Sequence, residues 1–189
     1  MQMTMKGIDI ADWQKNLNLD SIEYDFVIIK GTQGTNYVNT FCDAFVQKAI
    51  KAGKLWGFYH FMNMDDPVKQ ADHFYQNCKN YFGKGIPVLD YEDGGRIGTD
   101  GAKKFLDRIY ALTGVRCILY TYRNLTKEED WSRIAPNHAL WVAQYANENQ
   151  TGYQDSPWLP DGGFGAWNTC VMHQYSSHGR LSGYNGNLD

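Results

Sequence analysis

The chain has 189 residues, a length typical of one globular domain, and its 43% hydrophobic and 21% charged residues exclude a disordered or collagen-like chain. The net charge of −3 provides no broad positive field, so we do not expect a nucleic acid as partner. No apolar run approaches the roughly 18 residues that cross a bilayer, so we expect no membrane insertion.

Strand-like and helix-like segments alternate in the first part of the chain. Short apolar segments between turn residues predict strands over Gly7–Ile10, Phe26–Lys30 and Trp56–Phe61. Thr40–Ala52 has its apolar residues at helical spacing, and Gly53 follows as a stop signal, so a helix is predicted there.

The alternation continues in the next part of the chain. Asp66 and Pro67 are typical of a helix start, and apolar spacing predicts a helix as far as Cys78. Further helices are predicted from Asp100 to Gly114 and, as a shorter one, within Leu125–Ile134. Further strands are predicted over Ile86–Glu92, Val115–Tyr122, Leu140–Tyr145 and Val171–Tyr175.

This order of elements predicts an α/β fold with parallel strands, either a barrel or an open doubly wound sheet. Residues 146–169 are rich in Asn, Gly, Asp, Pro and Trp and indicate long loops. About eight strands with only four or five helices therefore favour a single domain, residues 1–189, folded as an irregular TIM-like β/α barrel that lacks several helices.

Polar and aromatic residues lie where the predicted strands end. In parallel α/β folds these carboxyl ends meet at one crevice, where catalytic side chains gather. The residues concerned are Asp9, Lys30, Tyr59, Asp90, Glu92, Tyr120, Gln144 and Gln174. With 13 Tyr and 6 Trp, the chain also has many flat side chains with a polar edge, which suit a groove for sugar rings or bases, although each could equally fill the core.

Asp90 and Glu92 form the sharpest local pattern. Residues two apart on a strand face the same side, with Cα atoms about 6.5 Å apart. One of two carboxyls this close is expected to have a raised pKa, and paired carboxyls are typical of enzymes that hydrolyse glycosidic bonds. A solvated acidic strand end or a magnesium or calcium site remains an alternative interpretation.

Other catalytic groups are not indicated. The five histidines show no zinc-binding spacing, and no serine or cysteine lies in a nucleophile motif. The four cysteines are far apart without a C-x-x-C pair, so we interpret them as buried thiols, with two long-range disulfides as the alternative. No cofactor and no metal are expected.

Taken in order, the motifs of the chain resemble glycoside hydrolase family 25, the lysozymes of phage endolysins and bacterial autolysins. The matching segments are 7–14 (GIDIADWQ), 26–35 (FVIIKGTQGT), 57–61 (GFYHF), 87–92 (PVLDYE), 140–145 (LWVAQY), 174–177 (QYSS) and 186–189 (GNLD). The resemblance implies an irregular barrel of eight strands and about five helices. It also implies hydrolysis of the β-1,4 bond between N-acetylmuramic acid and N-acetylglucosamine in bacterial peptidoglycan.

Site residues follow from the resemblance position by position. It implies that Glu92 is the proton donor and that Asp90, Asp9 and Asp189 are the other acids of the site. The substrate groove is expected to include Lys30, Tyr59, Tyr120, Trp141 and Gln174. Three groups could attack the anomeric carbon, namely the Asp90 carboxylate, a water molecule, or the acetamido oxygen of the substrate.

The chain stops abruptly at Asp189, and the family is modular, so we expect a catalytic domain trimmed from a longer protein with a C-terminal wall-binding region. Because no export signal is visible, we expect an endolysin made in the cytoplasm of a bacterial host that acts on the wall after release; a secreted autolysin is the alternative source. Alternative functions are a non-catalytic peptidoglycan-binding or lectin-like barrel and a wall amidase or peptidase.

Overall fold

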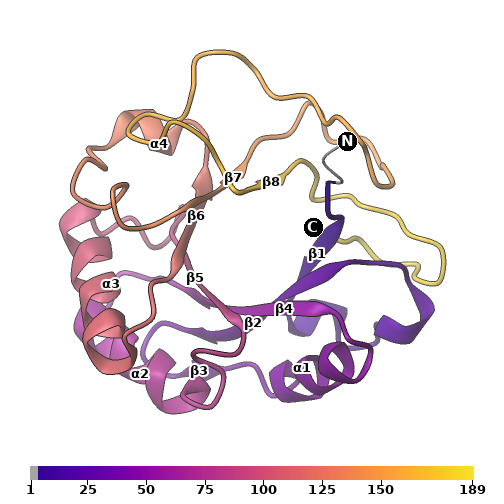
Figure 1. Cartoon of the computed structure of the whole chain (residues 1–189), viewed down its shortest axis with the longest axis horizontal. Coiled ribbons are helices and arrows are strands. Elements are labelled where there is room, and N and C mark those ends of the chain that lie inside the picture. The colour runs from indigo at the N-terminus through magenta and orange to yellow at the C-terminus, as the bar shows by residue number, and fades with distance from the viewer. Residues whose placement is uncertain (1–3) are drawn as a thin grey trace.

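Parallel strands curl into a ring in the computed structural model, which describes residues 4–189 (Figure 1). The order of the neighbouring strands is β1 (Gly7–Ile10), β2 (Phe26–Gln33), β4 (Leu55–Phe61), β5 (Ile86–Asp90), β6 (Ile118–Tyr122), β7 (Leu140–Ala143) and β8 (Met172–Gln174). The remaining strand, β3 (Tyr37–Val38), pairs antiparallel with the end of β2. The predicted irregular α/β barrel is confirmed.

Helices cover one side of the ring, and their ends follow from local sequence. They are α1 (Cys42–Lys51), α2 (Pro67–Cys78), α3 (Thr99–Thr113) and the short α4 (Leu125–Glu128). The Asp66 side chain accepts hydrogen bonds from the two backbone N–H groups of Val68 and Lys69, both at 2.9 Å, which fixes the start of α2. Gly114 ends α3 with φ of +69°, a conformation that favours glycine.

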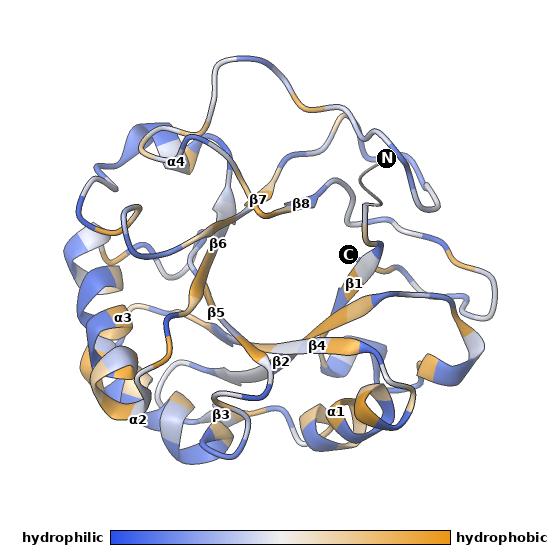
Figure 2. Cartoon of the chain, in the orientation of Figure 1, coloured by the Kyte–Doolittle hydropathy of each residue, from blue (hydrophilic) through white to orange (hydrophobic). Residues whose placement is uncertain are grey.

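The strands have two buried faces, because each separates the ring interior from the helix layer. Along β2, Val27 and Ile29 pack in the large core beneath the helices, whereas Ile28 packs inside the ring with Val88, Tyr120 and Trp141. This alternation follows from the two-residue period of a strand. Figure 2 shows hydrophobic residues along the strands and both hydrophobic and hydrophilic residues along the surrounding helices.

The ring is closed by loops rather than by a further helix. Between β7, β8 and β1 the view shows long connecting segments where the other half of the ring has helices (Figure 1). The C-terminal segment lies against β1, since the backbone N–H of Asp9 donates to the carbonyl of Asp189 at 3.0 Å. Gly179 and Leu188 exchange backbone hydrogen bonds of 2.8 and 3.1 Å, and Leu188 is buried. Asp189 is thereby held beside Asp9.

Several predicted boundaries were wrong. β2 runs on to Gln33 and turns back into β3, which was not predicted because two residues give no periodic signal. β6 begins at Ile118 rather than Val115, and α4 has four residues within the predicted segment Leu125–Ile134. The described part of the chain contains four α-helices, within the predicted four or five, whereas the resemblance implied about five.

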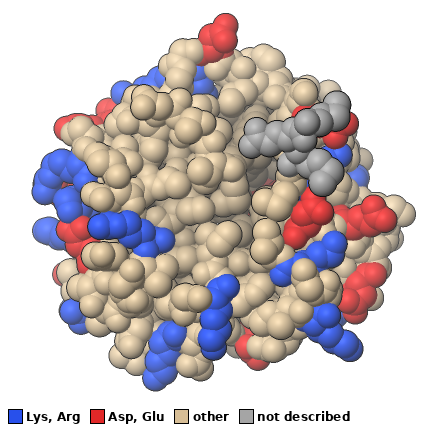
Figure 3. Space-filling view, viewed as in Figure 1, with Lys and Arg blue, Asp and Glu red and all other residues tan. Residues whose placement is uncertain are grey.

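All four cysteines carry free thiols, so the interpretation as thiols rather than as two disulfides is confirmed. Three of the four are buried. None of the helices described is both long enough and apolar enough to cross a lipid bilayer. On the face seen in Figure 3, Lys and Arg side chains lie mainly around the edge, and the middle consists mostly of uncharged residues.

Candidate active site

Inward-facing side chains at the carboxyl ends of the strands build the site. Strand register places Lys30 of β2 beside Tyr59 of β4. It also places Asp90 of β5 beside Tyr120 of β6, and Tyr120 beside Trp141 of β7. Parallel pairing brings these strand ends to one edge, and the two-residue period turns alternate side chains into the ring.

These side chains line a cleft of about 280 Å³ at this end of the barrel. All nine residues predicted for the site lie in its lining, namely Asp9, Lys30, Tyr59, Asp90, Glu92, Tyr120, Trp141, Gln174 and Asp189. A second groove of about 410 Å³ shares Glu92, Tyr120 and Tyr145 with the cleft and continues toward Arg123 and Glu148. The two hollows therefore meet at Glu92.

Asp90 and Glu92 share the inner side, as the spacing predicted, while the residue between them points away. Tyr91 is fully buried in the outer core, and its ring packs edge-on against Trp131 with centroids 5.2 Å apart. Asp90 is 7% exposed, and its Oδ1 atom has no hydrogen-bond partner among the described residues. Glu92 follows the strand end and is more exposed than Asp90.

A hydrogen-bonded group supports Asp9 on the opposite wall. The Gln174 amide donates to Asp9 Oδ2 at 2.8 Å, and Gln174 Oε1 accepts from the hydroxyl of Tyr120 at 2.8 Å and from that of Tyr145. Through these hydrogen bonds the group holds the Asp9 carboxyl and both phenol rings in place.

The four carboxyls share a crowded, partly dry environment. Burial raises the pKa of Asp9 and Asp90 well above the ordinary value, and neighbouring carboxylates raise it further. Burial and then the charge of Glu92 raise the pKa of Asp189 to about 6. Burial and then the charge of Asp93 raise the pKa of Glu92. The cleft therefore holds protonated acids at pH values where free carboxyls are ionised.

Lys30 brings a positive charge to this acidic cleft. Its Nζ atom donates to Gln33 Oε1 at 2.6 Å and lies over the rings of Tyr37 and Phe61, 5.2 and 4.9 Å from their centroids. The ammonium charge lowers the pKa of Asp90 and of Glu92, opposing the effect of burial. In the part of the chain described, no cluster of three or more His, Cys, Asp or Glu side chains is arranged to hold a metal ion.

Three aromatic residues of the lining, Trp13, Phe61 and Tyr145, were absent from the predicted set. Trp13, in the turn after β1, is 87% exposed at the edge of the cleft, and Tyr145 follows β7. Gln14 holds the turn beside Trp13, because its Oε1 accepts from the backbone N–H of Ala11 at 2.9 Å. Trp13 lies three residues after the end of β1, within the matched segment 7–14. Tyr120 and Trp141, in contrast, are over 90% buried and form the floor of the cleft.

Comparison with known proteins agrees with this geometry. Residues 8–184 match the sequence profile of Glycosyl hydrolases family 25. The chain is 28% identical to Lysozyme M1 of Streptomyces globisporus and 28% identical to an autolytic lysozyme of Clostridium acetobutylicum. Each match covers 98% of this chain but only 66% and 54% of those proteins, so the chain spans less than two thirds of their length. An N,O-diacetylmuramidase of Chalaropsis is 29% identical, with 98% of this chain and 96% of that protein covered.

Solved structures show the same fold. The bacterial lysozyme of Streptomyces coelicolor superposes with a TM-score of 0.78 at 27% identity, covering 100% of this chain and 91% of that one. The catalytic domain of endolysin ply40, from a phage of Listeria monocytogenes, superposes with a TM-score of 0.78 at 23% identity, covering 100% and 92%.

Proposed function

Because the chain belongs to glycosyl hydrolase family 25, we propose that it is a muramidase that hydrolyses the β-1,4 bond between N-acetylmuramic acid and N-acetylglucosamine in bacterial peptidoglycan. Relatives named as lysozymes and as an N,O-diacetylmuramidase support this activity and substrate. The observation that carries the proposal is the meeting of four carboxyls, from three distant parts of the chain, at one cleft.

Glu92 is the proposed proton donor. The pKa directions alone would favour Asp9 and Asp90 as protonated groups, because both are more deeply buried. Position favours Glu92, since it lies where the cleft and the second groove meet and is exposed enough to reach a bound glycosidic oxygen. Burial raises its pKa, which favours the protonated form that general-acid catalysis needs.

Asp90 is proposed to act on the other side of the reacting carbon. The Asp90 carboxyl lines the cleft, where it is proposed to accept a hydrogen bond from the substrate acetamido N–H or to face the developing positive charge. Attack could come from this carboxylate, from water, or from the acetamido oxygen that Asp90 would orient. In addition to burial, the charge of Asp189 is proposed to raise the pKa of Asp9, and the charge of Asp9, when ionised, to raise the pKa of Asp90.

Aromatic and basic groups are proposed to hold the glycan. Trp13 offers an exposed indole face at the rim, and Lys30 and Tyr59 present polar atoms within the cleft. Flat aromatic faces suit the apolar faces of sugar rings, which supports a polysaccharide as substrate. Tyr120, Trp141 and Gln174 are proposed to shape the floor of the cleft and to bind the glycan there. Tyr120 and Gln174 belong to the hydrogen-bonded group around Asp9.

The biological setting is also a proposal. The chain is proposed to be the catalytic domain of a longer modular protein with a C-terminal wall-binding region, acting in host lysis as a phage endolysin. In that role it would be made in the bacterial cytoplasm and reach the wall after release. Its relatives of greater length and the endolysin domain of the same fold support this setting.

Digestion of purified cell walls tests the activity, by turbidity and by counting new reducing ends. The wild type is expected to release reducing ends, and Glu92→Gln to lower that rate by about 10²- to 10⁴-fold. Equal rates for both proteins would refute the proposed acid. Binding of walls without cleavage would favour the lectin-like alternative, and new amino groups without reducing ends would favour an amidase or peptidase.

A further inference from the structure

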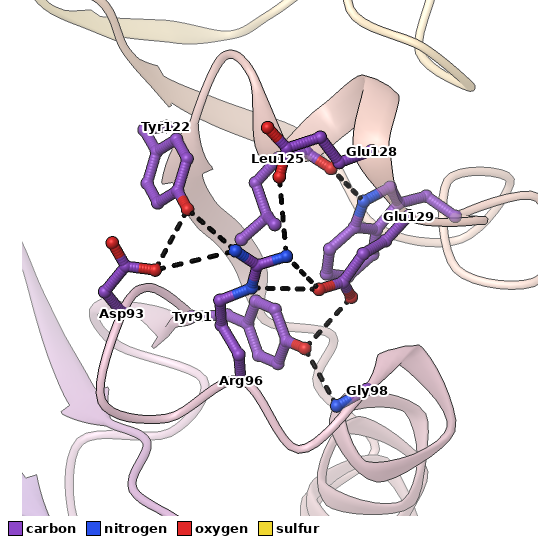
Figure 4. A network of polar contacts seen from close by, with 9 residues as sticks. Tyr91, Asp93, Arg96, Gly98, Tyr122, Leu125, Glu128 and Glu129 are labelled. Atoms are coloured by element: carbon purple, nitrogen blue, oxygen red, sulfur yellow. Dashed lines mark hydrogen bonds and ion pairs between the residues drawn. The ribbon is translucent and has the colours of Figure 1, made fainter.

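A branched set of polar contacts surrounds Arg96, in the segment between β5 and α3 (Figure 4). The guanidinium lies 3.2 Å from a Glu129 carboxyl oxygen, 3.4 Å from Glu128 and 3.7 Å from Asp93. It also donates to the hydroxyl of Tyr122 at 3.3 Å. One side chain therefore joins its own segment to the end of β6 and to α4.

Two phenols strengthen the same connection. The Tyr91 hydroxyl donates to Glu129 at 3.0 Å and accepts from the backbone N–H of Gly98 at 3.0 Å. The Tyr122 hydroxyl donates to Asp93 at 3.0 Å. Both ends of segment 91–98 are thus tied to the α4 region, as Figure 4 shows.

The α4 region is a rigid base for these contacts. Leu125 and Trp131 are 0% and 1% exposed, so both are packed in the core. The Trp131 indole N–H donates to the Leu125 carbonyl at 2.9 Å, which fixes the turn that carries Glu128 and Glu129. Contacts made to a packed, hydrogen-bonded turn restrict the segment more than contacts to a loose loop would.

Glu92 lies inside the anchored segment and has few restraints of its own. In the described chain, no other side chain or backbone group makes a hydrogen bond to its carboxyl. Its carbonyl accepts from the Gly95 N–H at 3.0 Å, and a Cβ at Gly95 would lie only 2.1 Å from the Met62 carbonyl oxygen. The position of the Glu92 carboxyl therefore depends on how the whole segment is held against its surroundings.

We propose that Arg96 is a positioning residue for Glu92, holding segment 91–98 against α4 so that the carboxyl stays at the junction of the cleft and the groove. The proposal rests on the proposed function, in which Glu92 is the acid. Arg96 does not line either hollow, so it acts through the segment rather than through contact with the glycan. Because proton transfer requires alignment within a fraction of an ångström, loosening the segment lowers turnover more than binding.

Arg108 provides a matched control. It pairs with Asp72 at 2.7 Å and so joins α3 to α2, away from the cleft. Its side chain is 41% exposed, close to the 37% of Arg96. An alanine at either position removes a half-exposed arginine, and Arg108→Ala loses one ion pair between helices. Arg96→Ala loses its ion pairs to Asp93, Glu128 and Glu129, and only this change releases the segment that carries Glu92.

The test compares Arg96→Ala, Arg96→Lys and Arg108→Ala with the wild type, after checking that all melt at similar temperatures. Hydrogen exchange of the Gly95 and Gly98 amides is expected to quicken at least about 10-fold in Arg96→Ala and to stay unchanged in Arg108→Ala. On cell walls, kcat is expected to fall about 10- to 100-fold in Arg96→Ala with KM within about 2-fold, and less in Arg96→Lys.

Unchanged exchange at Gly95 and Gly98 in Arg96→Ala would overturn the inference, as would a kcat equal to that of Arg108→Ala. Failure of the wild type to cleave walls would instead refute the proposed function. The exchange measurement would still decide whether Arg96 anchors the segment, so the two failures are distinguishable.

Discussion

Replacing Asp189 with Asn is expected to stabilise the fold at neutral pH while impairing hydrolysis. The Asp189 pKa of about 6, raised from 3.8 by burial and by Glu92, means that ionising this carboxyl costs the folded state more than the unfolded one. The difference between the two pKa values corresponds to a destabilisation of the folded state by about 3 kcal/mol. This destabilisation is absent at pH values below the unfolded pKa and complete at pH values above the folded pKa. The free energy of unfolding of the wild type therefore falls by about 3 kcal/mol as the pH rises from about 4 to above 6.

Asparagine removes the ionisation but retains the shape, and the backbone contact between Asp9 and residue 189 is unaffected. Allowing about 1 kcal/mol for a half-buried amide at either pH, Asp189→Asn should gain about 2 kcal/mol at pH 7.5 and lose about 1 kcal/mol at pH 3.5. Urea unfolding at the two pH values measures both changes. The exposed Asp161→Asn serves as control and should change stability by less than about 0.5 kcal/mol at either pH. Equal gains at both pH values, or a loss at pH 7.5, would refute the account of crowded acids.

Two further substitutions separate support of the site from contact with the glycan. Gln174→Leu leaves Asp9 and the buried hydroxyl of Tyr120 without their partner, so urea unfolding should show a loss of stability of about 2–4 kcal/mol. The control Gln154→Leu changes an exposed glutamine and should alter stability little. Equal losses in the two variants would contradict the role given to Gln174. Trp13→Ala should leave stability within about 0.5 kcal/mol but raise KM for wall fragments several-fold, because the indole is 87% exposed. Trp158→Ala, also exposed but outside the cleft, should leave KM unchanged, and a similar KM for both variants would exclude the proposed sugar contact.

Much of the site could be predicted because parallel strand order determines where the strands end and which way their side chains point. Parallel strands bring their carboxyl ends to one edge, and the two-residue period turns Lys30, Tyr59 and Asp90 into the ring. Local patterns such as Asp66 before Pro67 also placed α1, α2 and α3 within one or two residues of their ends.

The rest depends on segments without periodic sequence. The position of Asp189 beside Asp9 requires the C-terminal segment to pair through Leu188 and Gly179, which only the resemblance to a family indicated. The contacts of Arg96 with Glu128 and Glu129 join residues more than 30 positions apart, so no local pattern signals them. Trp13 was missed because an exposed aromatic residue in a turn looks the same in sequence whether or not it borders a cleft.

Mass spectrometry of wall fragments, reduced with borohydride after digestion, tests the central claim most directly, because it identifies the bond that the four-carboxyl cleft cleaves. The account predicts disaccharide-peptides whose reduced end is N-acetylmuramitol, in amounts that fall with Glu92→Gln. Fragments ending in reduced N-acetylglucosamine, or stem peptides freed from intact glycan, would contradict it.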